Sequence, residues 1–247
     1  MLLLLIIIWI VVIFLSTIFI SQYVKMQERS DVAIAFYVLF ITLSQIFAAK
    51  IGDFSIGAFQ ITAPVAVIIF PFTFQLTDMV NESFGRNEVY RMILIAFATQ
   101  ILMTIFIWFS IIITPAGYWG SEAQAFWEVF FASSIRITIA SWISFIITET
   151  LDALIYSKIR KITKGKHLWI RNVFSDVPML ALDSLIFVTI AFFGEVPLIV
   201  LVDIIIGQIL TKWFFGVIDT PFMYLSRGIV ENKITLFDKV TEKIIQR

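Results

Sequence analysis

The sequence contains no cysteine and a single histidine, His167. These absences exclude disulfides, thiolate metal sites and cysteine nucleophiles, and they also exclude zinc or haem sites built from several histidines. Charged residues are scarce, at 15% of the 247 residues, and 18 basic and 18 acidic side chains give a net charge of zero. Nucleic-acid binding is driven by clustered positive charge, which such a balance does not supply. We therefore expect no nucleic-acid partner, no metal site, no catalytic residue and no cofactor.

Hydrophobic residues, by contrast, make up 60% of the chain, and the mean hydropathy is +0.97. This composition does not fit a water-exposed surface. A bilayer core about 30 Å thick needs about 20 apolar residues per helix. The sequence therefore predicts an all-α integral membrane protein. Seven segments are expected to be transmembrane helices, namely 1–24, 32–49, 54–77, 92–121, 129–156, 177–193 and 196–219.

Local signals refine this layout. The first segment has neither a basic flank nor a small-residue cleavage site, so we expect a retained helix rather than a signal peptide. Residues 51–61 alternate loosely around Gly52 and Gly57, which indicates a short hairpin at the membrane surface. Pro197 suits the first turn of the seventh helix, where the missing N–H costs nothing.

The basic residues fall almost entirely on one side of the expected bundle. Of the 18, 15 lie in segments that share one side, while Lys50 alone lies on the other and Arg136 and Lys212 lie inside helices. Lysine and arginine gather in cytoplasmic loops, so we predict an outside N-terminus and a cytoplasmic C-terminus in the cell membrane. The tail 229–247 is expected to form a short amphipathic helix on the inner surface.

Charged side chains inside the expected helices cost about 2.5–3.5 kcal/mol each near the bilayer centre, so they should face a partner or a water-filled cavity. We expect Arg136 and Asp203, at similar depth near the outer side, to form a pair. A second, mainly acidic layer is expected nearer the cytoplasm, formed by Asp78, Glu149, Asp183 and Lys212. The alternative is that these charges only lock helix packing.

Helical periodicity places further polar residues on the same faces. Gln75 and Glu82 share a face with Asp78, and Gln208 and Asp219 share a face with Lys212. For Glu82, close to the aqueous boundary, simple solvation is an alternative to a functional role, and the same holds for Asp152.

One segment carries a resemblance to a known family. Residues 70–86 read FPFTFQLTDMVNESFGR, which resembles the signature of the queuosine precursor transporter family, also called the YhhQ or vitamin uptake transporter family. The similarity covers roughly residues 37–227. Further matching features follow in the family's order: Arg136, Asp152, the run Trp169-Ile170-Arg171-Asn172, Asp183-Ser184 and Lys212.

The resemblance implies a core of six transmembrane helices over 31–227, similar to the substrate-binding components of energy-coupling-factor transporters. The helix 1–24 would be an addition to this core, and 228–247 a cytoplasmic tail. The implied activity is import of a 7-deazaguanine precursor, such as 7-cyano- or 7-aminomethyl-7-deazaguanine. One carboxylate could accept both the N1–H and the 2-amino group, while a donor serves O6. The candidate substrate-binding residues are Gln75, Asp78, Asn81, Glu82, Arg136, Glu149, Asp152, Asn172, Asp183, Ser184, Gln208 and Lys212.

Other functions fit less well but stay open. An intramembrane enzyme is disfavoured because His167 lies in a basic loop, away from every membrane serine. A retinal protein would carry an Asp four residues before its Lys, where this chain has Gln208. The chain could instead be the substrate-binding subunit of an ATP-driven importer, since it has no Walker motif of its own. Both a homo-oligomer and a separate coupling partner are compatible with the sequence.

Overall fold

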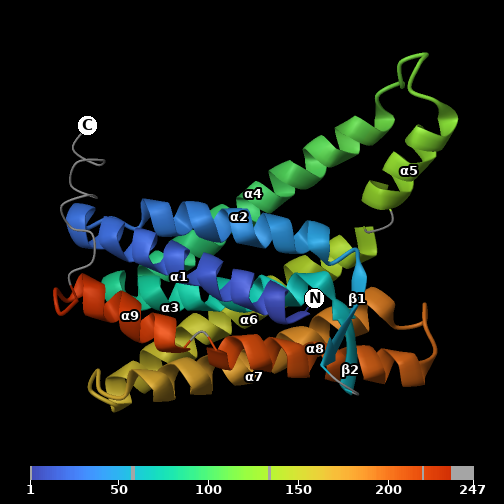
Figure 1. Cartoon of the computed structure of the whole chain (residues 1–247). Helices are drawn as coiled ribbons and strands as arrows, with labels where there is room; N and C mark the ends of the chain where they lie inside the picture. The colour runs from blue at the N-terminus through green and yellow to red at the C-terminus, as the bar shows by residue number, and fades with distance from the viewer. Residues whose placement is uncertain (1, 57–58, 133–134, 219, 235–247) are drawn as a thin grey trace.

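A computed structural model describes residues 2–56, 59–132, 135–218 and 220–234, and most of this chain is helical (Figure 1). The helices are α1 (Leu2–Gln27), α2 (Asp31–Phe47), α3 (Phe70–Phe84), α4 (Arg86–Ile112), α5 (Ser121–Ala132), α6 (Ile135–Ile162), α7 (Leu168–Phe192), α8 (Leu198–Ile218) and α9 (Thr220–Val230). Between α2 and α3 lie strands β1 (Ile51–Ile56) and β2 (Phe59–Pro64) and the 3-10 helix η1 (Val65–Ile68).

The helices agree with the predicted class of an all-α, multi-pass membrane protein. Five segments of the described chain are long and apolar enough to cross a bilayer, and they contain α1, α4, α6, α7 and α8. The helix α2 has 17 residues and α3 has 15, so both are shorter than a typical span. The count of seven spans therefore stays a prediction.

The predicted helix at 54–77 is wrong. Residues 51–56 and 59–64 pair as two antiparallel strands instead, in a register that runs from Ile51 opposite Pro64 to Ile56 opposite Phe59. The alternation noted in the sequence therefore continues further than expected, and a bond from the Val65 N–H to the Lys50 carbonyl (2.8 Å) closes the base of the hairpin. Helix α3 begins only at Phe70, with Pro71 in its first turn, where proline is well tolerated.

The short helix α3 lies at the centre of the bundle. Residues 71–81 are all buried, and α3 contacts α2, α4, α6, α7, α8 and α9. A helix surrounded by protein does not need a lipid-facing apolar side, so its polar residues can point to neighbouring helices. The helix ends at Gly85, whose φ of 86° turns the chain directly into α4.

Two helix boundaries differ from the prediction in ways that affect the site. Helix α7 begins at Leu168, well before the expected residue 177, and therefore includes Asn172 and Asp176. The segment 121–132 forms α5, which was not expected. Helix α4 runs away from the other helices toward this segment (Figure 1), and much of its outer half is exposed apolar surface suited to lipid.

Helix α1 is packed into the same bundle as the rest of the chain. It lies against α9, and the Gln75 amide of α3 donates to Thr17 (3.1 Å). The Trp9 indole N–H donates to the Ile68 carbonyl of η1 (2.5 Å). These bonds connect α1 to the segment that leads into the central helix.

The two ends of the bundle differ in chemistry. The hairpin lies at one end, and the α6–α7 connection lies at the other with α9 and the last turns of α1 and α3 (Figure 1). Most of the basic residues of the predicted cytoplasmic side belong to this second end, which we call the basic end. The orientation itself stays a prediction. Most of the predicted amphipathic tail, from 235 onward, lies outside the described residues, as does Asp219.

Candidate functional site

Buried polar side chains follow one another along the middle of the bundle, on α3, α6, α7 and α8. Starting from the hairpin end, the first group surrounds Asp183 of α7 and Lys212 of α8, which form a buried ion pair. The Lys212 ammonium also lies 4.1 Å from the centroid of the Phe70 ring of α3. The Asp183 carboxylate accepts a further hydrogen bond from the Ser144 hydroxyl of α6 (2.5 Å). Four helices thus meet at this pair.

A cavity of about 30 Å³ lies at the ion pair. Its lining includes the polar residues Ser44, Ser141 and Gln208 and the rings of Phe70 and Phe187, besides Asp183 and Lys212. The Gln208 Oε1 is buried and accepts no hydrogen bond from the residues that the structure describes. A cavity of this size holds a few water-sized groups. A larger ligand would enter only if side chains at the ion pair moved.

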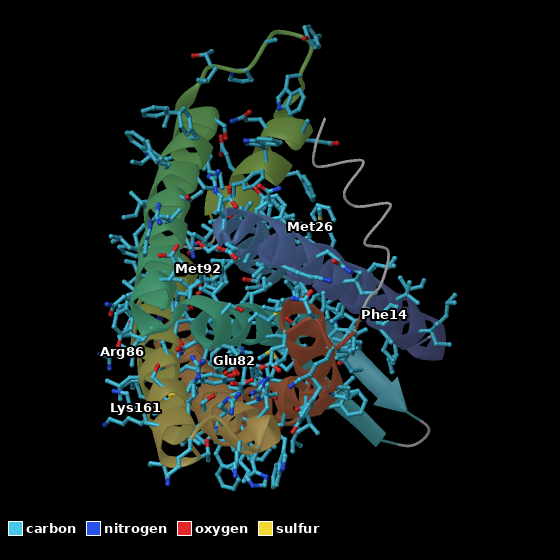
Figure 2. All side chains as sticks on the ribbon, turned by 90° about the vertical axis from the view of Figure 1, so that its left-hand side faces the viewer. Phe14, Met26, Glu82, Arg86, Met92 and Lys161 are labelled. Atoms are coloured by element: carbon cyan, nitrogen blue, oxygen red, sulfur yellow. The ribbon has the colours of Figure 1, made fainter. Side chains whose placement is uncertain are left out.

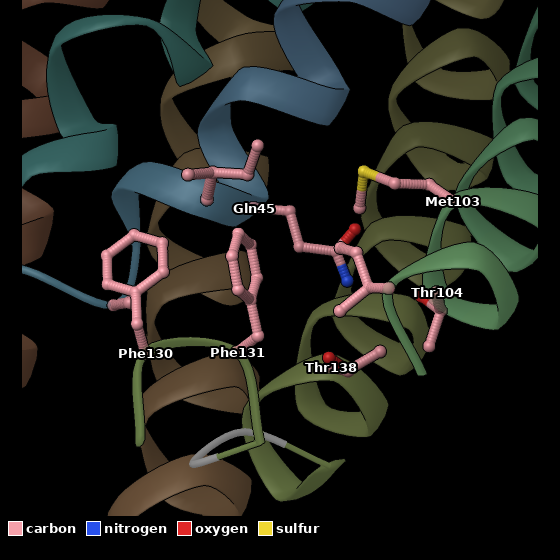
Figure 3. Close-up of a pocket in the computed structure, with 9 residues that line it drawn as sticks. Gln45, Met103, Thr104, Phe130, Phe131 and Thr138 are labelled. Atoms are coloured by element: carbon pink, nitrogen blue, oxygen red, sulfur yellow. The ribbon is translucent and has the colours of Figure 1, made fainter. Parts of the chain in front are cut away.

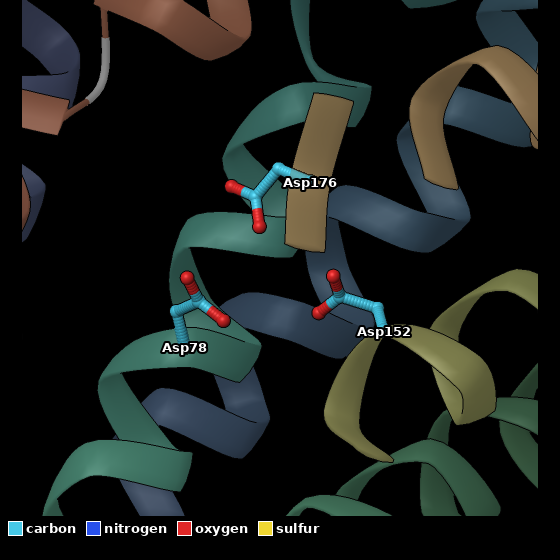
Figure 4. A group of neighbouring side chains, drawn as sticks. All are labelled: Asp78, Asp152 and Asp176. Atoms are coloured by element: carbon cyan, nitrogen blue, oxygen red, sulfur yellow. The ribbon is translucent and has the colours of Figure 1, made fainter. Parts of the chain in front are cut away.

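The next group along the bundle contains two more carboxylates of α6. Glu149 is fully buried and accepts a hydrogen bond from the Thr73 hydroxyl of α3 (3.2 Å). One turn further, Asp152 lies close to Asp78 of α3 and Asp176 of α7 (Figure 4). One carboxylate oxygen from each of these three aspartates lies within 4.8 Å of the others.

The last group is a network of ion pairs at the basic end. Glu82 of α3 bonds the buried Arg171 of α7 (2.7 Å) and lies 3.5 Å from Arg160 and 3.7 Å from Arg227. Figure 2 looks onto this end, with Glu82 inside the bundle and Arg86 and Lys161 toward one margin. Asn81 is held by the backbone: its amide donates to the Ala153 carbonyl (3.1 Å). These contacts join α3, α6, α7 and α9.

A second cavity, of about 60 Å³, lies between α2, α4, α5 and α6 (Figure 3). Gln45, Thr104 and Thr138 are its polar lining residues, and Met103, Phe130 and Phe131 are among the apolar ones. The described lining contains no charged side chain, so this cavity offers less to a polar heterocycle than the one at Asp183.

Comparisons with known proteins identify the family. The model of the family described as "Putative vitamin uptake transporter" matches residues 64–226, which is more than half of the chain. The chain belongs to this family. The resemblance inferred from the segment 70–86 is thus confirmed.

A relative from Bacillus subtilis (strain 168) extends this finding. It is named "Probable queuosine precursor transporter" and is 28% identical to this chain over 179 residues, which cover 72% of this chain and 77% of the relative. No solved structure matches the chain significantly. The similarity to energy-coupling-factor components therefore stays a prediction.

Within this member of the uptake transporter family, the predicted acidic layer is divided in two. Asp183, Lys212 and Gln208 lie nearer the hairpin end, where they line one cavity. Asp78 is not among the lining residues of that cavity and lies instead with Asp152 and Asp176, next to Asn172. Asp78 and Asp183 therefore do not line the same cavity, and the expectation that both contact one substrate stays a prediction.

The predicted pairing of Arg136 with Asp203 is also wrong. Arg136 bonds Glu195 (2.9 Å) and the carbonyls of Ile190 and Phe193, all of them in the last turns of α7 or just beyond. Asp203 is exposed on α8. Sequence depth alone could not show that the connection after α7 folds back to supply a carboxylate to Arg136.

Two other candidates make packing contacts, and their role in binding stays a prediction. The Gln75 amide bonds Thr17 of α1, and the Ser184 hydroxyl bonds the Leu180 carbonyl of its own helix (2.8 Å). Residues missed by sequence reasoning include Asp176, because the predicted sixth helix began one residue after it. The spacing of Asn172 and Asp176, four apart on one helical face, is the signal that could have found it.

Proposed function

We propose that this protein imports a 7-deazaguanine precursor of queuosine across the cell membrane. Its membership of an uptake transporter family and its similarity to a relative with that name support this function. The observation that carries the proposal is the ion pair of Asp183 and Lys212 at the wall of a cavity that also holds aromatic rings. A carboxylate and an ammonium side by side complement the donor and acceptor edge of a guanine-like base.

The proposed binding mode uses both partners of the ion pair. Asp183 would accept the N1–H and the 2-amino group together, as carboxylates accept from exocyclic amines of bases. Lys212 would donate to O6, and the planar ring would stack on Phe70 or Phe187. Because the cavity measures about 30 Å³, binding requires the substrate to separate the two side chains. The substrate would then replace the salt bridge with charge-assisted hydrogen bonds to both side chains.

The 7-substituent would point toward Glu149, the next carboxylate along the bundle. Glu149 follows Ser144, the α6 residue that bonds Asp183, by five residues and is fully buried, so it is a near carboxylate for a charge on the substrate. A protonated aminomethyl group would be attracted by this carboxylate, whereas a neutral cyano group would not. Glu149→Gln should therefore weaken binding of the aminomethyl compound more than binding of the cyano compound.

The test measures binding of both precursors to purified protein by calorimetry. Asp183→Asn should lower the affinity about ten- to a hundred-fold, since an amide offers one acceptor where two are needed. Asp203→Asn, the same change at an exposed position of α8, should bind like the wild type. If Asp183→Asn binds with wild-type affinity, Asp183 is not part of the substrate site. If the wild-type protein binds neither precursor, the proposed function is contradicted.

Uptake into proteoliposomes by this chain alone, with and without a proton gradient, tests transport itself. Accumulation of the precursor is expected for a self-sufficient importer. Binding without uptake would show that the chain is the substrate-binding subunit of a larger complex.

A further inference from the structure

The interior of the bundle contains more negative than positive charge. Among the buried side chains of the described residues, five are carboxylates, namely Asp78, Glu149, Asp152, Asp176 and Asp183. Two are cations, Arg171 and Lys212, and both already have a carboxylate partner, Glu82 and Asp183 respectively. Uncompensated charge is very costly away from water. Protons or a bound cation can neutralise such an excess of buried carboxylates.

The excess is concentrated at one point. Asp78 of α3, Asp152 of α6 and Asp176 of α7 turn their carboxylates toward one another from three helices (Figure 4). One oxygen of each lies within 4.8 Å of the others, and all three side chains are buried. That spacing is about twice the 2.3–2.6 Å at which oxygen ligands bind calcium. A single ion at the centre could therefore contact all three.

Asp152 gives independent evidence of a missing ligand. Its side chain is 0% exposed, yet neither of its carboxylate oxygens accepts a hydrogen bond from the described part of the chain. The nearby Ser175 hydroxyl donates to Asp176 instead (2.9 Å). Buried polar atoms are nearly always satisfied, so two buried carboxylate oxygens without a donor point to a group that is bound there.

The other two aspartates are positioned by their surroundings. The Asn172 amide donates to both Asp78 (3.0 Å) and Asp176 (2.8 Å). The amide is itself oriented by the Thr220 hydroxyl, which donates to its oxygen (2.8 Å). One amide therefore holds two carboxylates in place, an arrangement that keeps ligands ready for an ion.

We propose that Asp78, Asp152 and Asp176 bind a hard, oxygen-ligated metal cation. This proposal revises the expectation, drawn from the lack of cysteine and histidine, that the chain has no metal site, because carboxylates alone suit such ions. The site is separate from the substrate cavity, whose lining contains none of the three aspartates. Asp176 precedes Asp183 by seven residues of α7, which corresponds to about 10 Å along the helix.

The role of the ion follows from its place in the bundle. It would bind between the substrate cavity and the basic end, on helices that also form that cavity. Occupation of the site would draw α3, α6 and α7 together and so affect the shape of the cavity. The ion could drive transport only if the protein is a transporter, so that role rests on the proposed function. The proposal that the three aspartates bind an ion does not depend on it.

The test uses the purified full chain, freed of metal by a chelator and kept in choline chloride. Its melting temperature is followed while NaCl, CaCl₂ or MgCl₂ is added at constant ionic strength. At least one ion should raise the melting temperature in a saturable way, and the comparison shows which one. Asp152→Asn should weaken that ion's apparent affinity at least about ten-fold. Asp203→Asn, which removes an exposed carboxylate, should respond like the wild type.

Two outcomes would overturn the proposal. The first is that no metal produces a saturable shift in the wild type while pH alone changes its stability, since the aspartates would then be neutralised by protons. The second is an unchanged response in Asp152→Asn. If Asp152→Asn does not fold, equilibrium dialysis of the wild type against the active ion decides, because a stoichiometry below one ion per chain also contradicts the site. Substrate affinity, measured separately, shows whether the proposed function stands on its own.

Discussion

Lys212 of α8 and Asp183 of α7 form an ion pair from which water is almost fully excluded, with side chains that are 2% and 5% exposed. Removing water from two charges is expensive, so such a pair persists only where its geometry and further bonds compensate. Here the Ser144 hydroxyl bonds the carboxylate and the Phe70 ring lies beside the ammonium. The pair is thus both a packing element and the chemical group of the proposed substrate site.

This pair predicts a strong coupling in stability. Lys212→Met leaves the Asp183 carboxylate buried without its partner and should lower the free energy of unfolding by about 3–5 kcal/mol. Adding Asp183→Asn removes the stranded charge and should restore much of that loss. Thermal unfolding of the two single variants and the double variant in detergent measures the coupling. Additive losses in the double variant would show that the two side chains do not depend on each other.

The contact between α7 and α8 gives a second prediction. A Cβ atom at Gly216 would lie 2.8 Å from the Leu180 Cδ1 atom, closer than side chains tolerate without a shift. Gly216→Ala also gains helix propensity, so its net effect should be small. Gly216→Val should cost about 1–3 kcal/mol through overpacking.

The control for this prediction is internal to the chain. Gly117→Ala meets nothing within 4 Å and should leave the melting temperature unchanged. Adding Leu180→Ala to Gly216→Val makes room for the new side chain and should recover part of the loss. If adding Leu180→Ala lowers the stability of Gly216→Val further, the two residues are not in contact.

Much of the fold could be predicted from the sequence because bilayer physics imposes long apolar helices. The segment 54–77 was misjudged for the same reason: apolar composition does not distinguish a hairpin from a helix, and only the alternation around Gly52 and Gly57 indicated strands. For the site, helix depth in the sequence grouped Asp183 with Lys212, and the two do meet at one cavity, while their role in substrate binding stays a prediction. Which helix faces which, and hence the meeting of Asp152 with Asp176, depends on packing that one sequence does not reveal.

The pair of Arg136 and Glu195 should contribute little to stability, in contrast to the buried pair. Both side chains are substantially exposed, at 43% and 65%. Exposed ion pairs are typically worth about 0–1 kcal/mol, well below the roughly 3–5 kcal/mol expected for breaking the buried pair. Glu195→Gln should therefore change the melting temperature by no more than about 4 °C. A loss as large as that of Lys212→Met would show that this end of α7 is buried by another molecule or by lipid.

The last prediction concerns orientation. The α6–α7 connection, α9 and the last turn of α3 meet at one end of the bundle, and the hairpin lies at the other (Figure 1). Basic residues are concentrated in and next to the segments of the first end. Because lysine and arginine are retained in the cytoplasm, reporter fusions at Lys166 and Gln246 should both read cytoplasmic, and a fusion at Gly120 should read external. This orientation places the cavity at Asp183 toward the outside, where an importer must capture its substrate. An external signal at Lys166 would reverse the topology and would place the same cavity on the side of release.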